Sequence, residues 1–264
     1  MRHGLYVAPF DELSDPLVAV EVAVAAEETG WDGIFLWDHI WRPSDRSFAV
    51  GDAWITLAAM AARTSSIRLG PMVVPLARRR PQKVAREAVA LDRLSDGRLT
   101  LGVGLGVDTD GELRRFGEVV DEHERGNVLD EALALLLDLW SGNEVHHHGE
   151  TFTADGVRFL PRAIQTPRIP IWGAARGGSG TRPIRRASRL DGVFPVGASG
   201  DQLERMLECI HIARGSLEGF DVAVVEPKDE TDDLPLRDGV TWLLRPIDTN
   251  VTAARALEVA SRAP

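Results

Sequence analysis

One stretch of the chain, residues 66–106, constrains the fold more than any other. Residues 67–74 form a β-branched, apolar run, which is typical of a parallel strand buried on both faces. Pro81 suits the first turn of a helix, where its missing N–H would have no partner, and Gly97 suits the left-handed residue that ends one. Residues 98–103 form a second apolar run that leads into a glycine-rich segment. The stretch therefore predicts a strand–helix–strand unit with two parallel strands.

The same alternation of strand and helix recurs along the chain. We predict eight strands, at residues 4–9, 33–37, 67–74, 98–103, 169–173, 192–196, 220–225 and 239–244. Helices are predicted at residues 17–29, 52–63, 81–96, 127–140, 182–189, 202–217 and 252–260. Such alternation indicates parallel strands with crossover helices. Eight units predict an α/β fold of the eight-stranded parallel (β/α)8 TIM-barrel type, with a doubly wound open sheet as the alternative.

Two segments depart from this rhythm. Residues 141–166 separate the fourth helix from the fifth strand, and we interpret them as an insertion that holds two short strands. Residues 228–237 are acidic and too short for an ordinary crossover, so we predict a shortened seventh helix there. A length of 264 residues suits one barrel domain over residues 1–264.

Composition excludes several functional classes. The chain has 30 Lys and Arg against 40 Asp and Glu, a formal charge of −10, which argues against nucleic-acid and anionic-membrane surfaces. No apolar run approaches the roughly 20 residues of a membrane span, and residues 1–20 lack the apolar stretch of a signal peptide. We therefore expect a cytoplasmic protein. The single Cys209 excludes an intrachain disulfide, and its helical context predicts a buried, reduced thiol.

Four predicted strand ends carry polar or glycine-rich segments. They are Trp37-Asp38-His39, Met72-Val73-Val74-Pro75, Gly104-Leu105-Gly106 and Trp172-Gly173-Ala174-Ala175-Arg176. In a parallel barrel the loops after the strands build the active site at one end. Glycines there let backbone N–H groups approach an anion, and Arg176 and Arg182 would add charge-assisted hydrogen bonds. A phosphate site is thus predicted near residues 173–182, although glycine-rich loops are often only turns.

The run P-L-A-R-R-R-P-Q-K-V-A-R-E-A-V-A-L-D-R-L-S-D-G-R-L-T-L-G-V-G-L-G resembles the luciferase-like flavin-dependent oxidoreductases. This family includes bacterial luciferase-like monooxygenases and deazaflavin-dependent dehydrogenases and reductases. The match over residues 75–106 is ungapped, and a looser match extends from Gly4 to about Trp242. The resemblance implies an oxidoreductase that transfers a hydride between FMN, or the deazaflavin coenzyme F420, and an unidentified small organic substrate. With FMN, the enzyme would be a two-component monooxygenase that uses O2 and a separate flavin reductase.

The resemblance also implies where the cofactor lies. Its ring would rest against the third strand, with a non-prolyl cis peptide at Met72-Val73, and its phosphate would meet the loops after the fourth and fifth strands. The implied cofactor-binding residues are Met72, Val73, Val74, Gly104, Leu105, Gly106, Trp172, Gly173, Ala174, Ala175 and Arg176. Asp38 and His39 match a pair that deazaflavin-dependent members place near the ring, where histidine exchanges a proton. A homodimer is common in the family.

The chain departs from the deazaflavin-dependent dehydrogenases after its fourth strand. Those proteins commonly place a proton-transferring glutamate where this chain has Val107. The neighbouring Asp108 is the candidate substitute, and the change speaks against sugar phosphates as substrates. Phe10 and Trp41 are weaker candidates for the substrate pocket, Trp41 as a lid over the ring.

Other interpretations compete with an enzyme of this family. A non-catalytic barrel that binds flavin without turnover is one alternative. A phosphate-binding isomerase or aldolase is another, but it would need a lysine or glutamate at a strand end, and none is present at those predicted. The consecutive His146, His147 and His148 cannot all face one ion, so no metal site is predicted. Structural ion pairing or contact with the cofactor edge is expected for Arg78, Arg79 and Arg80.

Overall fold

The computed structural model describes residues 1–42, 48–108, 111–178, 180–227 and 239–264. Over these residues nine strands form one parallel sheet: β1 (Arg2–Val7), β2 (Gly33–Leu36), β3 (Arg68–Pro71), β4 (Val74–Pro75), β5 (Leu101–Gly104), β8 (Ile171–Arg176), β9 (Gly192–Val196), β10 (Asp221–Val225) and β11 (Trp242–Ile247). The strand order is β3-β2-β1-β11-β10-β9-β8-β5-β4. The first strand therefore pairs with the last, as a barrel requires.

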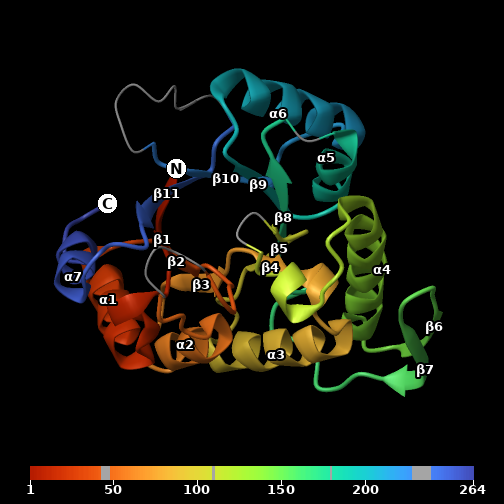
Figure 1. Ribbon diagram of the computed structural model, residues 1–264, viewed down its shortest axis with the longest axis horizontal. Helices are drawn as coiled ribbons and strands as arrows, with labels where there is room; N and C mark the ends of the chain where they lie inside the picture. The colour runs from red at the N-terminus through yellow and green to blue at the C-terminus, as the bar shows by residue number, and fades with distance from the viewer. Residues whose placement is uncertain (43–47, 109–110, 179, 228–238) are drawn as a thin grey trace.

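The sheet closes because β3 and β4 are two halves of one strand, interrupted at Met72 and Val73. Val74 of β4 pairs with Val103 of β5, and Leu69 of β3 bridges Leu99 just before β5. With β3 and β4 counted together, eight strands surround the barrel axis (Figure 1). The predicted eight-stranded parallel barrel is confirmed, and the open sheet is excluded.

Helices on the outside of the barrel connect these strands (Figure 1). They are α1 (Pro16–Thr29), α2 (Ala53–Ala61), α3 (Pro81–Leu94), α4 (Glu122–Trp140), α5 (Thr181–Ala187) and α6 (Gly200–Arg214), with α7 (Ala253–Ala260) after the last strand. Short 3-10 turns are η1 (Asp11–Ser14), η2 (Leu76–Arg78) and η3 (Arg114–Phe116). The predicted short seventh connection, residues 228–237, lies outside the described residues.

Local signals explain where the helices begin and end. The Asp15 carboxylate accepts a hydrogen bond from the Leu17 N–H, Pro16 occupies the first turn of α1, and Gly30 ends it with a positive φ. Helix α4 begins at Glu122 rather than at the predicted residue 127. The reason is Asp121, whose carboxylate caps the helix by accepting from the Glu124 N–H.

The insertion forms an antiparallel hairpin of β6 (Glu144–His148) and β7 (Thr153–Arg158), which projects beside α4 (Figure 1). The Glu131 carboxylate of α4 holds it by accepting hydrogen bonds from the N–H groups of Thr151 (2.9 Å) and Phe152 (2.7 Å). His147 Nε2 lies 3.2 Å from the same carboxylate. Over the described residues, no group of three or more His, Cys, Asp or Glu side chains is arranged to hold a metal ion.

The interior of the barrel is aromatic. Phe35, Trp172 and Trp242 are fully buried, with ring centroids 5.3–5.6 Å apart, and Met72 and Phe194 pack with them. Aromatic rings suit this position because a few large side chains fill the space that eight strands enclose. Of the residues in this cluster, Met72 and Phe194 also line the cavity at the carboxyl ends of the strands.

Two further findings concern the outer layer. Cys209 is exposed on α6, so the prediction of a buried thiol is wrong. The buried face of that helix is formed by Leu203, Met206, Leu207 and Ile210, and Cys209 lies outside it. Among the helices of the described residues, none combines the length and the apolar character that crossing a membrane requires.

Candidate functional site

A cavity of about 540 Å³ opens at the carboxyl ends of the strands, the end at which the sequence predicted a site. Its walls come from segments far apart in the chain. The residues that line it include Tyr6, Trp37, Asp38, His39, Met72, Val73, Arg78, Gly104, Leu105, Gly106, Glu112, Ala174, Arg176, Arg182, Arg186 and Phe194. The cavity thus brings together parts of all four predicted strand-end segments.

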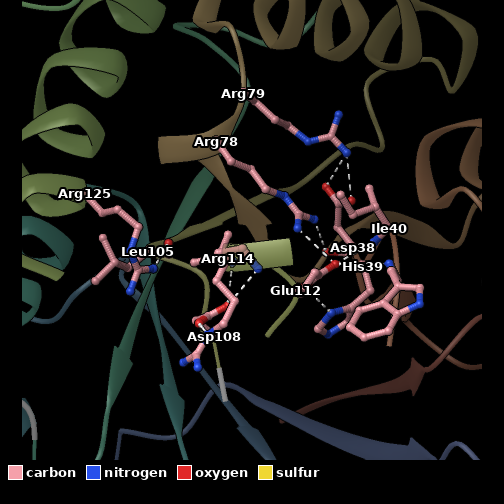
Figure 2. Close-up of polar contacts among 12 residues, drawn as sticks. Asp38, His39, Ile40, Arg78, Arg79, Leu105, Asp108, Glu112, Arg114 and Arg125 are labelled. Atoms are coloured by element: carbon pink, nitrogen blue, oxygen red, sulfur yellow. Dashed lines mark hydrogen bonds and ion pairs between the residues drawn. The ribbon is translucent and has the colours of Figure 1, made fainter. Parts of the chain in front are cut away.

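His39 is held in this cavity by a glutamate that sequence reasoning did not single out. Its Nδ1 lies 2.9 Å from Glu112 Oε2 (Figure 2). The other carboxylate oxygen accepts from the Ile40 N–H at 2.7 Å and the Trp41 N–H at 3.3 Å, and it lies 2.9 Å from Arg78 Nη1. Glu112 therefore fixes both the imidazole and the backbone that follows it.

The charge state of Glu112 determines the tautomer of His39. Burial raises the pKa of Glu112, but hydrogen bonding and charge from His39, the Ile40 N–H and the Arg78 guanidinium outweigh it and lower the pKa to about 2. An ionised carboxylate can only accept hydrogen bonds, so Nδ1 of His39 carries a proton. In the neutral imidazole Nε2 is then the basic nitrogen, free to exchange a proton.

Asp38 is buried and already paired. Both of its carboxylate oxygens accept from Arg79 Nη2, at 2.8 and 2.9 Å (Figure 2). Trp54 Nε1 lies 3.3 Å from Oδ2. Its backbone oxygen accepts from Arg78 Nη2 at 3.2 Å. These contacts hold the Asp38-His39 segment in place. Arg78 and Arg79 thus form the structural ion pairs that were one of their two expected roles.

Asp108 does not line the cavity. Its Oδ1 accepts from the N–H groups of Leu113 (2.8 Å) and Arg114 (3.0 Å), and its Oδ2 accepts from Arg114 Nε at 2.6 Å. Burial raises its pKa, and the larger opposing effect of the hydrogen bonds to Arg114 and Leu113 lowers it. Asp108 therefore holds the backbone at Leu113 and Arg114, directly after Glu112. No periodicity in residues 107–126 distinguishes Glu112 from the other carboxylates there, so only the folded loop identifies it.

The wall predicted to support the cofactor ring combines β3, β4 and β5. The Met72-Val73 peptide is cis, as predicted. Met72 and Val73 line the cavity, whereas Val74 is fully buried behind them. Arg125 Nη1 fixes the neighbouring loop by donating to the backbone oxygens of Leu105 (2.9 Å) and Gly106 (3.1 Å). The wall is apolar and firmly held.

Side chains of the predicted segment 172–176 point alternately to the two faces of β8, so only some of them reach the cavity. Ala174 and Arg176 line the cavity, while Trp172 fills the barrel interior and Ala175 packs outward. Gly173 lies against α5, where an added Cβ would come within 3.0 Å of Ala187. Ala174 and Arg176 are thus the residues of this segment that reach the cavity.

Two further arginines of the cavity lining, Arg182 and Arg186, are paired with a carboxylate of the protein. Arg182 and Arg186 line the cavity mouth, but both donate to the Asp130 carboxylate, Arg182 Nε at 2.9 Å and Arg186 Nε at 2.5 Å. Arg182 was predicted to bind a phosphate, but it already has an anionic partner within the protein, Asp130.

Neither of the two weaker pocket candidates lines the cavity. Phe10 is buried, with its ring centroid 5.9 Å from that of His39 and 6.1 Å from that of Trp37. Trp41 lies under the guanidinium of Arg115, 5.0 Å from its ring centroid. The aromatic residues that line the cavity are instead Tyr6, Trp37 and Phe194, of which the sequence analysis named only Trp37.

Known proteins resemble this chain in sequence. The family description "luciferase-like monooxygenase" matches residues 11–226. The F420-dependent glucose-6-phosphate dehydrogenase of Gordonia bronchialis is 34% identical over 196 residues, which are 73% of this chain and 56% of that protein. The F420-dependent hydroxymycolic acid dehydrogenase of Mycobacterium tuberculosis is 34% identical over 167 residues, 62% of this chain and 44% of that protein. The chain spans about half the length of these curated relatives.

Solved structures share its fold. An F420-dependent secondary alcohol dehydrogenase superposes with a TM-score of 0.74 at 21% identity, covering 85% of this chain and 68% of that one. The oxygenating constituent of 3,6-diketocamphane monooxygenase from Pseudomonas putida, in complex with FMN, gives 0.70 at 18% identity, covering 85% and 67%. The sequence match to the family description spans most of the chain and includes its cavity-forming strands β2 to β10. On this evidence the chain belongs to the luciferase-like monooxygenase family.

Proposed function

We propose that the protein is a deazaflavin-dependent oxidoreductase, which transfers a hydride between coenzyme F420 and a small organic substrate. The observation that carries the proposal is His39, oriented by an ionised Glu112, in the same cavity as the Met72-Val73 wall. The names of the relatives from Gordonia bronchialis and Mycobacterium tuberculosis favour F420 as the cofactor.

The cavity suits a cofactor of this kind. Met72, Val73, Leu105 and Ala174 give it an apolar lining for a planar ring, and Arg176 supplies a cation for a phosphate. We propose that these residues, with Gly104 and Gly106, hold the cofactor, and that Val74 supports them from behind. When bound, a deazaflavin supplies a hydride acceptor or donor at its central ring.

The protein then has to orient the substrate and move a proton. We propose that His39 Nε2 takes the proton of a substrate hydroxyl during oxidation and returns it during reduction. Glu112 is a positioning residue, which keeps Nδ1 protonated and stabilises the imidazolium that forms. Asp38 and Asp108 hold the segments that carry His39 and Glu112, so we assign neither a proton transfer.

An FMN-dependent monooxygenase, supplied by a separate flavin reductase, is the second candidate, because the FMN-bound neighbour shares the barrel. A homodimer and a cytoplasmic location remain predictions. Glucose 6-phosphate is not proposed as the substrate, since Val107 replaces the expected glutamate and Arg182 and Arg186 are paired with Asp130.

Cofactor titration tests the proposal. The purified protein is titrated with F420 and with FMN, each oxidised and reduced, and ring fluorescence or absorbance is followed. We expect tighter binding of F420, and weaker F420 binding by Arg176→Ala. Preference for reduced FMN would transfer the assignment to the monooxygenase. If neither cofactor binds, the proposed function is wrong.

A further inference from the structure

Tyr6, the only tyrosine of the chain, lies on the cavity wall. It is the penultimate residue of β1, and its ring centroid is 5.4 Å from that of Trp37 and 5.4 Å from that of Phe194. The interplanar angles of 42° and 65° are tilted and edge-on arrangements that aromatic pairs favour. Tyr6 is therefore clamped between two other rings of the cavity lining.

The Tyr6 hydroxyl has no protein partner within the described part of the chain. None of the described residues forms a hydrogen bond with it, although part of the residue remains exposed to the cavity that it lines. Burial, followed by the negative charge of Asp248, raises the pKa of Tyr6 well above its ordinary value, against the opposing charge of Arg42. The side chain thus stays a neutral O–H donor, and an acceptor on a ligand would complete it.

This donor and the proposed proton acceptor pack against the same ring. The centroid of the Trp37 ring lies 5.4 Å from that of Tyr6 and 5.9 Å from that of His39. Met72, Val73 and Ala174, which line the same cavity, are apolar. A molecule against the Trp37 ring would therefore meet the Tyr6 hydroxyl, the basic nitrogen of His39 and a largely apolar surface, beside the Arg42 guanidinium that lies over the ring.

Charge around this wall is balanced. Arg79 neutralises Asp38, and Arg78 neutralises Glu112. Arg42 lies over the Trp37 ring, 5.5 Å from its centroid, and the charges of Arg42 and Asp248 act on Tyr6 with opposite sign. Arg42 and Asp248 also have interactions of their own. A phosphate or a carboxylate at this wall would lose its hydration without gaining a dedicated cation, and a polyol would leave most of its hydroxyl groups without partners.

We propose that Tyr6, Trp37 and Phe194 form the substrate subsite, and that it takes an uncharged, largely apolar molecule with one carbonyl or hydroxyl oxygen, which accepts a hydrogen bond from Tyr6. The assignment of this molecule as the substrate rests on the proposed function, which assigns the proton exchange to His39 of the same cavity. The prediction of an uncharged, largely apolar ligand does not need the proposed function, because it depends only on the residues that line this wall.

Because the chain has one tyrosine, this subsite can be observed selectively. Protein labelled with 3-fluorotyrosine gives a single ¹⁹F resonance, which is followed while cyclohexanone, methylenecyclohexane or glucose 6-phosphate is added. We expect cyclohexanone to shift the resonance, and glucose 6-phosphate to leave it unchanged at the same concentrations. By calorimetry, Tyr6→Phe should weaken cyclohexanone binding roughly three- to tenfold. It should not weaken binding of methylenecyclohexane, which has the same shape but no oxygen.

Thr153→Val is the matched control, since it deletes an exposed hydroxyl on β7, far from the cavity. Equal cyclohexanone affinity in wild type and Tyr6→Phe, or a response to glucose 6-phosphate as large as that to the ketone, would overturn the proposal. The cofactor titration is independent of this experiment. If ketone binds at Tyr6 but neither cofactor binds, the ligand subsite stands and the oxidoreductase assignment fails.

Discussion

At the scale of single residues, the pair His39–Glu112 is the most consequential feature of the cavity. Glu112→Gln keeps the shape of the side chain but removes the charge that holds Nδ1–H and stabilises the imidazolium. We expect kcat to fall about 10- to 100-fold, with the Kd of F420 nearly unchanged. Steady-state kinetics and cofactor titration check this. Glu118→Gln is the control in the same loop, and a loss in Kd instead of kcat would contradict a positioning role.

Glu112 also gives a signed pH dependence of stability. Its pKa is about 2 in the folded protein against an ordinary 4.5, so its contribution to stability is present above the ordinary value and is lost as the pH falls through this window. The wild type should therefore exceed Glu112→Gln in Tm near neutral pH, and the difference should shrink between pH 4.5 and 2. Differential scanning fluorimetry across this range measures it. A constant difference would show that Glu112 is not held as an ion.

The pH dependence of stability that Tyr6 contributes has the opposite sign to that of Glu112. Its pKa is raised, so its contribution is complete below the ordinary value of 10.0 and is lost as the pH rises towards the folded value. As the only tyrosine, it reports its own ionisation through tyrosinate absorbance in the near ultraviolet. We expect no tyrosinate near pH 10.0 while circular dichroism shows a folded protein. A normal titration of the folded protein would place the hydroxyl in open water and remove the basis for the subsite.

At the scale of elements, the contacts of Asp108 with Leu113 and Arg114 connect a residue outside the cavity to Glu112 within it. Asp108→Ala removes the acceptor for the Leu113 and Arg114 N–H groups and should displace Glu112. We expect a loss of kcat similar to that of Glu112→Gln. The double variant should be little worse than either single variant, because both changes act through one contact. Additive losses would mean that Asp108 has an independent role.

The sequence predicted the strands of the barrel better than it predicted the residues of the site. Each strand is a local apolar run between helix-ending or turn-forming residues, so all eight could be placed, and the Met72-Val73 cis peptide followed from family resemblance. Glu112 could not be found in the same way. Its partners, His39 and Arg78, lie 73 and 34 residues away in the sequence, and no local periodicity encodes a contact across a folded loop. The prediction of a buried Cys209 was wrong for a related reason, because helical spacing alone did not show which face of α6 is buried.

At the scale of the whole molecule, the proposed cofactor site spans neighbouring strands that are far apart in the sequence. Its proposed cofactor-binding residues come from the β3–β4 junction, from β5 and its loop, and from β8. β5 pairs with both β4 and β8. A ligand that contacts all of these segments binds the closed barrel and not the unfolded chain, so its binding energy adds to global stability.

The size of this effect can be predicted. At a free concentration of 100 times its Kd, F420 should stabilise the protein by about 2.7 kcal/mol. For a domain of this size that corresponds to a rise in Tm of roughly 5–10 °C. The rise should continue logarithmically with concentration, whereas inorganic phosphate, which lacks the ring, should give a much smaller shift. Thermal unfolding at several cofactor concentrations measures both. A Tm that does not change at saturating cofactor would place the bound molecule on a segment that opens before the barrel unfolds, rather than across β4, β5 and β8.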